Sequence, residues 1–97
     1  MYTSKPLNIL LVDDDPDAHL LVGDIFATSE RRHILRHARD GKEALDYLLR
    51  RGNYRKSGQA PRPDLILLDR RMPNMDGDQL CGRLRADVSL KNIPIIM

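Results

Sequence analysis

A chain of 97 residues is long enough for one small domain, in which folding buries about 60–65% of the surface of the unfolded chain. Its 41% hydrophobic and 31% charged residues are typical of a soluble globular domain, and its single cysteine excludes a disulfide framework and a cysteine-rich metal cluster. The longest apolar runs have four residues, which excludes a membrane-spanning helix, and the polar residues 2–6 predict no signal peptide. We therefore expect one domain over residues 1–97, located in the cytoplasm.

The net charge of +2 is small, and the basic residues form short clusters at Arg31-Arg32, Arg50-Arg51 and Arg55-Lys56. Nucleic-acid binding requires a continuous basic face with aromatic side chains that stack on bases. This chain has three tyrosines and one phenylalanine, and its basic clusters are scattered. We expect these clusters to be solvated surface, and we predict neither nucleic acid nor a membrane as a direct partner.

Residues 9–12 form an apolar run that is too short for a helix and typical of a parallel strand covered on both faces. Asp15 and Pro16 predict a helix start, because aspartate accepts backbone N–H bonds and proline lacks a donor that the first turn would leave unpaired. This helix ends near Thr28. Its apolar side chains recur on one face, which we expect to be the inward face: Ala18, Leu21, Val22, Ile25 and Phe26.

The middle of the chain predicts a weakly apolar strand at His33–Ala38, which suits a sheet edge. Asp40-Gly41 then begins a second helix that ends near Arg51-Gly52. A long polar loop follows over residues 53–63. The side chains of the second helix that we expect to face inward are Ala44, Leu45, Leu48 and Leu49.

The last third of the chain predicts a strand at Leu65–Leu68, a helix at Gly77–Ala86 and the start of a fourth strand at 93–97. The expected buried side chains of this third helix are Leu80, Cys81 and Leu84. Strands that alternate with helices predict an α/β fold with a parallel sheet and helices on both faces. In a flavodoxin-like doubly wound sheet the strand order is 2-1-3-4, so the first and third strands are neighbours.

Acidic residues follow both of these neighbouring strands, Asp13 and Asp14 after the first and Asp69 after the third. The carboxyl ends of such strands flank the crevice where doubly wound sheets bind ligands. Three carboxylates in one crevice repel one another unless a cation is present, and an oxygen-only donor set favours Mg²⁺, with Mn²⁺ or Ca²⁺ as substitutes. A carboxylate can also act as a nucleophile and form an aspartyl phosphate.

Other polar or reactive residues have simpler explanations. Asp15 and Asp76 are expected to cap helices, and Cys81 is expected in the core. Met72 and Met75 are expected to pack a turn. The histidines lack a shared ligand spacing and are interpreted as surface or strand residues: His19, His33 and His37.

The motif DRRMPNMDG at residues 69–77 follows LILL, and Asp13-Asp14 follows ILLV. In these motifs and in the order of its elements, the chain resembles the receiver domain of two-component response regulators. Residues 52–69, which include APRPDLILLD, are similar to stand-alone receivers that work with bacteriophytochrome-type sensor kinases.

The resemblance implies a role for four residues. Asp69 would be the phosphoacceptor, receiving a phosphoryl group from a sensor histidine kinase or a phosphotransfer protein. Asp13 and Asp14 would hold Mg²⁺ together with Asp69, with Asp14 a direct ligand, and the backbone carbonyl of Arg71 would complete the protein ligands. The chain would then be a signalling module that takes part in its own phosphorylation, not a turnover enzyme.

The resemblance also assigns structural roles and reveals a departure. Met72-Pro73 would shape the loop after the acceptor, and Gly77 would permit its tight entry into the third helix. The family places a Thr or Ser after the fourth strand and a Lys after the fifth, and both would fall beyond Met97. We expect the fifth strand and the last two helices to be missing from this chain. This would leave an apolar face beside the first helix and a bare edge at 93–97.

Such open surfaces predict either a fragment of a longer receiver or a homodimer, with or without swapped elements. Two alternative functions stay open at this point. One is a degenerate or truncated receiver that acts only as a docking or dimerisation module. The other is a haloacid-dehalogenase-type phosphatase, because Asp13-x-Asp15 after a strand resembles the nucleophile and acid/base pair of that class.

Overall fold

The computed structural model describes residues 5–28, 32–56, 58, 60–72 and 74–97. Arg31 and Pro73, for which the sequence predicts a basic cluster and a turn, lie outside these ranges. The α/β alternation predicted from the sequence is confirmed. The elements are β1 (Leu7–Val12), α1 (Pro16–Ala27), β2 (His33–Ala38), α2 (Gly41–Leu48), a 3₁₀ turn (Gly52–Tyr54), β3 (Leu65–Leu68), α3 (Gly77–Ala86) and β4 (Ile95–Ile96).

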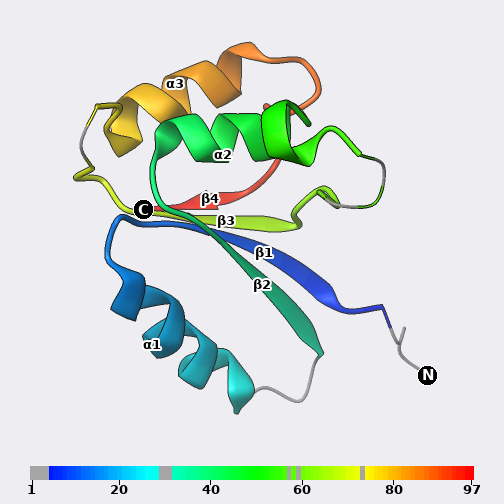
Figure 1. Cartoon of the computed structure of the whole chain (residues 1–97), viewed down its shortest axis with the longest axis vertical. Helices are drawn as coiled ribbons and strands as arrows, with labels where there is room; N and C mark the ends of the chain where they lie inside the picture. The colour runs from blue at the N-terminus through cyan, green and yellow to red at the C-terminus, as the bar shows by residue number, and fades with distance from the viewer. Residues whose placement is uncertain (1–4, 29–31, 57, 59, 73) are drawn as a thin grey trace.

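The strands form one parallel sheet in the order β2-β1-β3-β4, as predicted for a doubly wound fold. Figure 1 shows α2 and α3 on one face of this sheet and α1 on the other. The carboxyl ends of β1 and β3 are adjacent, because Val12 pairs with Leu68 in the register of the two strands. The segments that follow these strands therefore begin side by side.

The core of the domain lies between the sheet and the pair α2 and α3. Alternate side chains of a strand point to the same face, which places Leu10 and Val12 of β1 on the face that these two helices cover. From α3, Leu80 and Leu84 are 0% and 1% exposed and close this core from above. The other large contributors are Leu45, Tyr47, Leu48, Ile66, Leu68, Leu90 and Ile93.

The opposite face is only partly covered. Every residue of α1 is at least partly exposed, and the Leu21 and Ile25 side chains, which the sequence predicts to face inward, are 64% and 61% exposed. The helix lies against β2, where the Phe26 ring contacts the His33 ring at 5.5 Å between centroids. Because α1 contacts the edge strand, the inward prediction is wrong for Leu21 and Ile25. The predicted open sheet face beside this helix is at least partly covered, since Ile9 and Leu11 of β1 are buried, and the exposed apolar side chains lie on α1 itself.

Several element bounds differ from the sequence-based expectation. Helix α2 ends at Leu48 instead of near residue 51, because Arg50 takes a left-handed backbone conformation (φ 54°) and Arg51 N–H donates to the Asp46 carbonyl at 2.8 Å. Leu49 is consequently exposed. Strand β1 begins at Leu7, two residues early.

Near the C-terminus, β4 is confined to Ile95–Ile96. Pro94 has no N–H to offer a sheet, although its carbonyl accepts the N–H of Ile66 at 2.9 Å. Ile96 is 58% exposed, as the predicted bare edge requires, whereas Ile93 is buried in the core. Cys81, which the sequence analysis expects in the core, is partly buried and packs against the core cluster.

The polar loop between α2 and β3 is tied to α2 by two tyrosines. The Tyr47 hydroxyl donates to the Pro61 carbonyl at 2.8 Å, and the Tyr54 hydroxyl donates to Glu43 Oε1 at 3.2 Å. The two rings meet edge to face at 5.1 Å. Burial raises the pKa of both hydroxyls, and the neighbouring Glu43 carboxylate raises the pKa of Tyr54 further.

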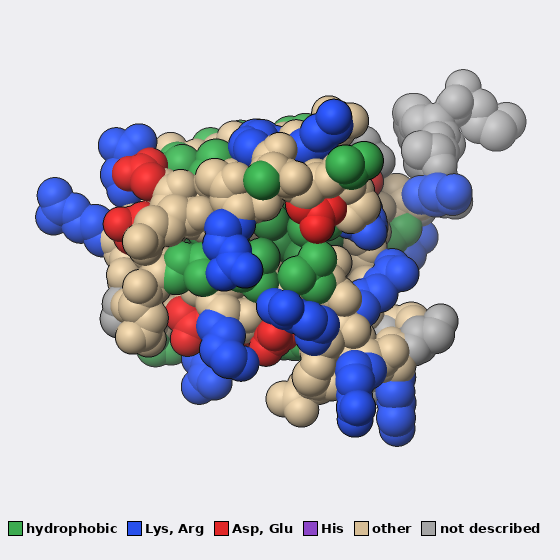
Figure 2. Space-filling model, turned by 90° about the horizontal axis from the view of Figure 1, so that it is seen from above, with side chains coloured by type: hydrophobic (Ala, Val, Ile, Leu, Met, Phe, Trp, Pro, Cys, Tyr) green, Lys and Arg blue, Asp and Glu red, His purple; other side chains and the backbone are tan. Residues whose placement is uncertain are grey.

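Figure 2 looks onto the face formed by α2 and α3, where Lys and Arg side chains are interrupted by hydrophobic and acidic ones. Arg50, Arg51, Arg55 and Lys56 are exposed, which agrees with the interpretation of these basic clusters as solvated surface. Within the described ranges, no helix combines the length and apolar character needed to cross a bilayer.

Candidate functional site

Three carboxylates meet at the carboxyl end of the sheet. Asp13 and Asp14 follow β1, and Asp69 follows β3. One oxygen of each lies within 4.8 Å of an oxygen of the other two. The neighbouring strand ends thus bring together the three side chains that the sequence analysis singles out.

Backbone hydrogen bonds fix the positions of these residues. Asp69 N–H donates to the Val12 carbonyl at 2.8 Å, which continues the pairing of β1 and β3 by one residue. The Asp69 carboxylate accepts the N–H of Arg71 through Oδ1 at 3.1 Å. Asp13 Oδ1 similarly accepts the N–H of Asp15 at 2.9 Å, so both carboxylates are held by the chain that follows them.

The two acidic residues expected to cap helices do so. The Asp15 side chain accepts the N–H of Asp17 at 2.9 Å at the start of α1. Asp76 forms a reciprocal capping box with Gln79 at the start of α3, in which side chain and backbone of each residue are bonded to the other. Neither residue belongs to the three-carboxylate group among the described residues.

The loop from Asp69 to α3 is packed closely against its surroundings. A Cβ atom on Gly77 would lie 2.6 Å from the Asp69 carbonyl oxygen, so only glycine allows α3 to begin this close to Asp69. Met72 is buried in the core, and the Met75 sulfur would lie 2.9 Å from a Cβ on Gly41 at the start of α2. The methionines therefore pack the turn as predicted, and Gly77 permits the tight helix entry.

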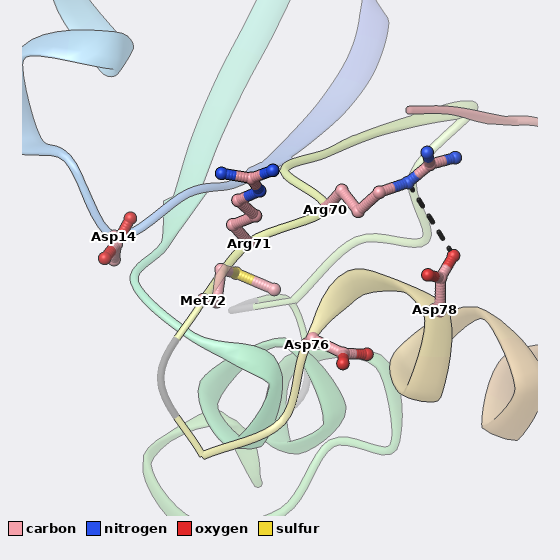
Figure 3. Close-up of a pocket in the computed structure, with 6 residues that line it drawn as sticks. All are labelled: Asp14, Arg70, Arg71, Met72, Asp76 and Asp78. Carbon is pink, nitrogen blue, oxygen red and sulfur yellow. Dashed lines mark ion pairs between the residues drawn. The ribbon is translucent and has the colours of Figure 1, made fainter.

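An open pocket of about 490 Å³ adjoins the carboxylates (Figure 3). Its lining residues are Asp14, Arg70, Arg71, Met72, Asp76 and Asp78. Arg70 forms an ion pair with Asp78 at 3.8 Å on one wall. The exposed Arg71 side chain stands between Asp14 and Arg70 in this view. The pocket lining therefore combines two guanidinium groups with three carboxylates.

The donor set suits a hard divalent cation. All three converging side chains offer carboxylate oxygens, and no histidine or cysteine of the described chain joins this group. Oxygen ligands favour Mg²⁺, Mn²⁺ or Ca²⁺ over softer metals, and the cation would relieve the repulsion among the three negative charges. The residues present therefore fit a divalent metal ion.

Sequence reasoning missed one contact of this site. His37 Nε2 lies 2.7 Å from the backbone carbonyl oxygen of Asp13, a contact that the sequence analysis did not predict. The histidines line the interface between α1 and β2, where the His19 and His37 rings lie 5.5 Å apart. The predicted pairing of parallel strands could have indicated this contact, since Leu11 pairs with His37 and Asp13 follows two residues later.

Comparisons with known proteins agree on one family. The sequence model of the response regulator receiver domain matches residues 9–97. Response regulator Rcp1 of Synechocystis sp. is 37% identical over 95 residues, which are 98% of this chain and 63% of Rcp1. Its Mn²⁺-bound structure superimposes with a TM-score of 0.83 at 38% identity, covering 93% of this chain and 63% of that one.

Two further solved structures come from proteins linked to phytochromes. The phosphorylated cyanobacterial phytochrome response regulator RcpA has a TM-score of 0.83 at 36% identity, over 94% of this chain and 63% of that one. The bacteriophytochrome response regulator RtBRR has a TM-score of 0.75 at 34% identity, and the match covers 96% of this chain and 55% of RtBRR. The chain thus spans about 55–63% of the length of these relatives. The matched region includes DRRMPNMDG, which the phosphatase alternative leaves unexplained.

Proposed function

This chain belongs to the response regulator receiver domain family of two-component signalling, and we propose that its Asp69 carboxylate accepts a phosphoryl group from a histidine kinase or a phosphotransfer protein. The observation that carries the proposal is the convergence of Asp13, Asp14 and Asp69 within 4.8 Å at the ends of β1 and β3. An open pocket lined by Asp14 lies beside this group and leaves room there for a phosphorylated donor.

The reaction uses Asp69 as a nucleophile. An oxygen of its carboxylate forms a bond to phosphorus while the bond from phosphorus to the donor's imidazole nitrogen breaks, and the electron pair of that bond stays on the imidazole. The product is an acyl phosphate on Asp69. Such a transfer needs mainly positioning and charge neutralisation, and the Arg71 N–H and the β1–β3 pairing already position the carboxylate.

The metal of this site is Mg²⁺, with Mn²⁺ or Ca²⁺ as substitutes. Asp13, Asp14 and Asp69 would hold it through side-chain oxygens, with Asp14 a direct ligand, and the Arg71 backbone carbonyl would complete the protein ligands. When bound, the cation supplies positive charge against the carboxylates and the phosphoryl oxygens. The Mn²⁺-bound structure of Rcp1 supports a divalent metal for this family.

The domain's role is signalling, in the cytoplasm, without turnover of an independent substrate. The phytochrome-linked relatives RcpA and RtBRR support a bacteriophytochrome-type sensor kinase as the phosphoryl donor.

A second candidate function is a docking or dimerisation module, which the exposed apolar side chains favour. Leu21 and Ile25 of α1 are more than 60% exposed, and Ile96 lies open on the β4 edge. Exposed apolar patches and bare strand edges are common association sites. Light scattering at increasing protein concentration measures whether a homodimer forms through these surfaces.

Phosphorylation of variants with acetyl phosphate and Mg²⁺ tests the main proposal. Wild type should gain the mass of one phosphoryl group, Asp69→Asn should gain none because an amide is not a nucleophile here, and removal of Mg²⁺ by EDTA should suppress labelling. Asp78→Asn is a matched control, because it removes an exposed carboxylate from the same pocket outside the converging group. Labelling of Asp69→Asn would contradict the proposal, and an unlabelled wild type would favour the docking module.

A further inference from the structure

The contact between His37 and Asp13 joins the edge strand to the carboxylate site. His37 Nε2 lies 2.7 Å from the Asp13 carbonyl oxygen in a partly buried hydrogen bond. A carbonyl oxygen only accepts, so the imidazole must donate and carries its proton on Nε2. The bonded oxygen belongs to the peptide group that links Asp13 to Asp14. A side chain of β2 thus holds the peptide between two of the three converging carboxylates.

The backbone of Asp13 is held at both of its polar groups by β2. Its N–H donates to the Ala38 carbonyl at 3.0 Å, and its carbonyl accepts from His37, the residue just before Ala38. Its carboxylate accepts the N–H of Asp15 through Oδ1. These three bonds fix the peptide plane and the side-chain direction together. Because the Asp14 N–H belongs to the same peptide group, the direction of the Asp14 side chain also depends on the bond to His37.

The His37 ring is itself packed on the α1 side of the sheet. The His19 ring lies against it with 5.5 Å between centroids and 36° between planes. His19 Nδ1 is buried and has no hydrogen-bond partner in the described part of the chain, so its contribution to this interface is packing. A packed donor loses little side-chain freedom when it bonds, which makes the contact to Asp13 a fixed feature of the site.

We propose that His37 is a positioning residue: its Nε2–H holds the Asp13–Asp14 peptide so that both carboxylates converge with Asp69, and it thereby raises the affinity for a divalent cation. The inference rests on the proposed function, because it requires that these carboxylates bind a metal. In the absence of metal, the three carboxylates repel one another and tend to move apart. A hydrogen-bond donor that is not itself a metal ligand, such as His37, opposes this movement. Hydrogen bonds of this kind typically change metal affinity by about tenfold or more when they are removed.

Mn²⁺ titration of the whole chain, followed by the electron paramagnetic resonance signal of free Mn²⁺, tests the inference. His37→Phe keeps a ring beside His19 but removes the donor, and it should weaken Mn²⁺ binding by about tenfold. His37→Gln keeps an N–H donor and should recover most of that loss. The matched control is His33→Phe, which changes a histidine on the same face of β2 that contacts Phe26 and should leave Mn²⁺ affinity unchanged.

The outcomes separate this inference from the proposed function. If Asp13→Asn and Asp69→Asn weaken Mn²⁺ binding but His37→Phe does not, the role of His37 is overturned and the carboxylate site stands. If wild type binds no Mn²⁺, both are overturned. Should His37→Phe fail to fold, the ring ¹⁵N spectrum of wild type decides instead: a proton on Nε2 supports the bond, and a proton on Nδ1 alone overturns it.

Discussion

On one face of the sheet, α2 and α3 bury nearly every side chain they direct inward, with Leu80 and Leu84 almost without solvent contact. On the other face, no residue of α1 (Pro16–Ala27) is buried, and its Leu21 and Ile25 side chains remain exposed. Apolar burial is the main favourable contribution to folding. The free energy of unfolding therefore depends chiefly on the α2–α3 face, while α1 contributes less.

This difference extends to the candidate site, because its two halves are held from different faces. Gly77, Met72 and Met75 fix the Asp69 segment against α3, the core and the start of α2. The Asp13 segment instead depends on β2 and on His37, whose ring packs against α1. Asp69, the proposed phosphoacceptor, is thus attached to the well-packed face, and Asp13 and Asp14, the proposed metal ligands, are attached partly to the weakly covered one.

The largest expected effect is a loss of folding stability, and it should differ sharply between a leucine truncated on one face and a leucine truncated on the other. Leu80→Ala removes a side chain that is 0% exposed and should lower the free energy of unfolding by about 2–5 kcal/mol. Leu21→Ala removes one that is 64% exposed and should change it by less than about 0.5 kcal/mol. Urea denaturation measures both values. Equal losses in the two variants would contradict the difference between the faces.

A smaller effect is expected where α3 meets the Asp69 segment. Gly77→Ala places a Cβ atom 2.6 Å from the Asp69 carbonyl oxygen and should destabilise the domain by about 1–3 kcal/mol, because backbone atoms must shift. Gly82→Ala in the same helix meets no atom within 4 Å and should stabilise the domain by about 0.5–1 kcal/mol.

These two glycine variants also test how Asp69 is held. Gly77→Ala should slow labelling by acetyl phosphate, since the displaced backbone carries Asp69, the proposed acceptor, whereas Gly82→Ala should leave labelling unchanged. Normal stability and labelling in Gly77→Ala would show that the close approach of α3 is not required.

The sequence was sufficient to predict the strand order and the convergence of Asp13, Asp14 and Asp69, because parallel alternation places the ends of β1 and β3 together. Helix caps were equally predictable, since Asp15 and Asp76 act through local hydrogen bonds. The burial of side chains on α1 could not be predicted, because helical periodicity identifies an apolar stripe but does not show which element covers it. The His37 contact was also missed, since it depends on the position of a side chain across two strands.

The smallest expected effect concerns how the helices on the two faces end. After α3, Asp87 Oδ1 accepts the N–H and the hydroxyl of Ser89 at 2.8 and 2.6 Å, and these bonds lower the pKa of Asp87 below its usual 3.8. After α1, the neutral Thr28 hydroxyl donates to the Ile25 carbonyl at 2.9 Å. Only the end of α3 should therefore respond to acid.

Because the folded pKa of Asp87 is depressed, the stability it contributes is present above the pKa of the unfolded chain and disappears as the pH falls through the folded pKa. Asp87→Asn should be slightly less stable than wild type near about pH 7, and the difference should disappear once the pH falls below the folded pKa of Asp87. Thr28→Ala should instead lose a small amount of stability that does not change with pH. Thermal unfolding midpoints across this range measure both, and a pH-independent difference for Asp87→Asn would show that charge on Asp87 does not stabilise the end of α3.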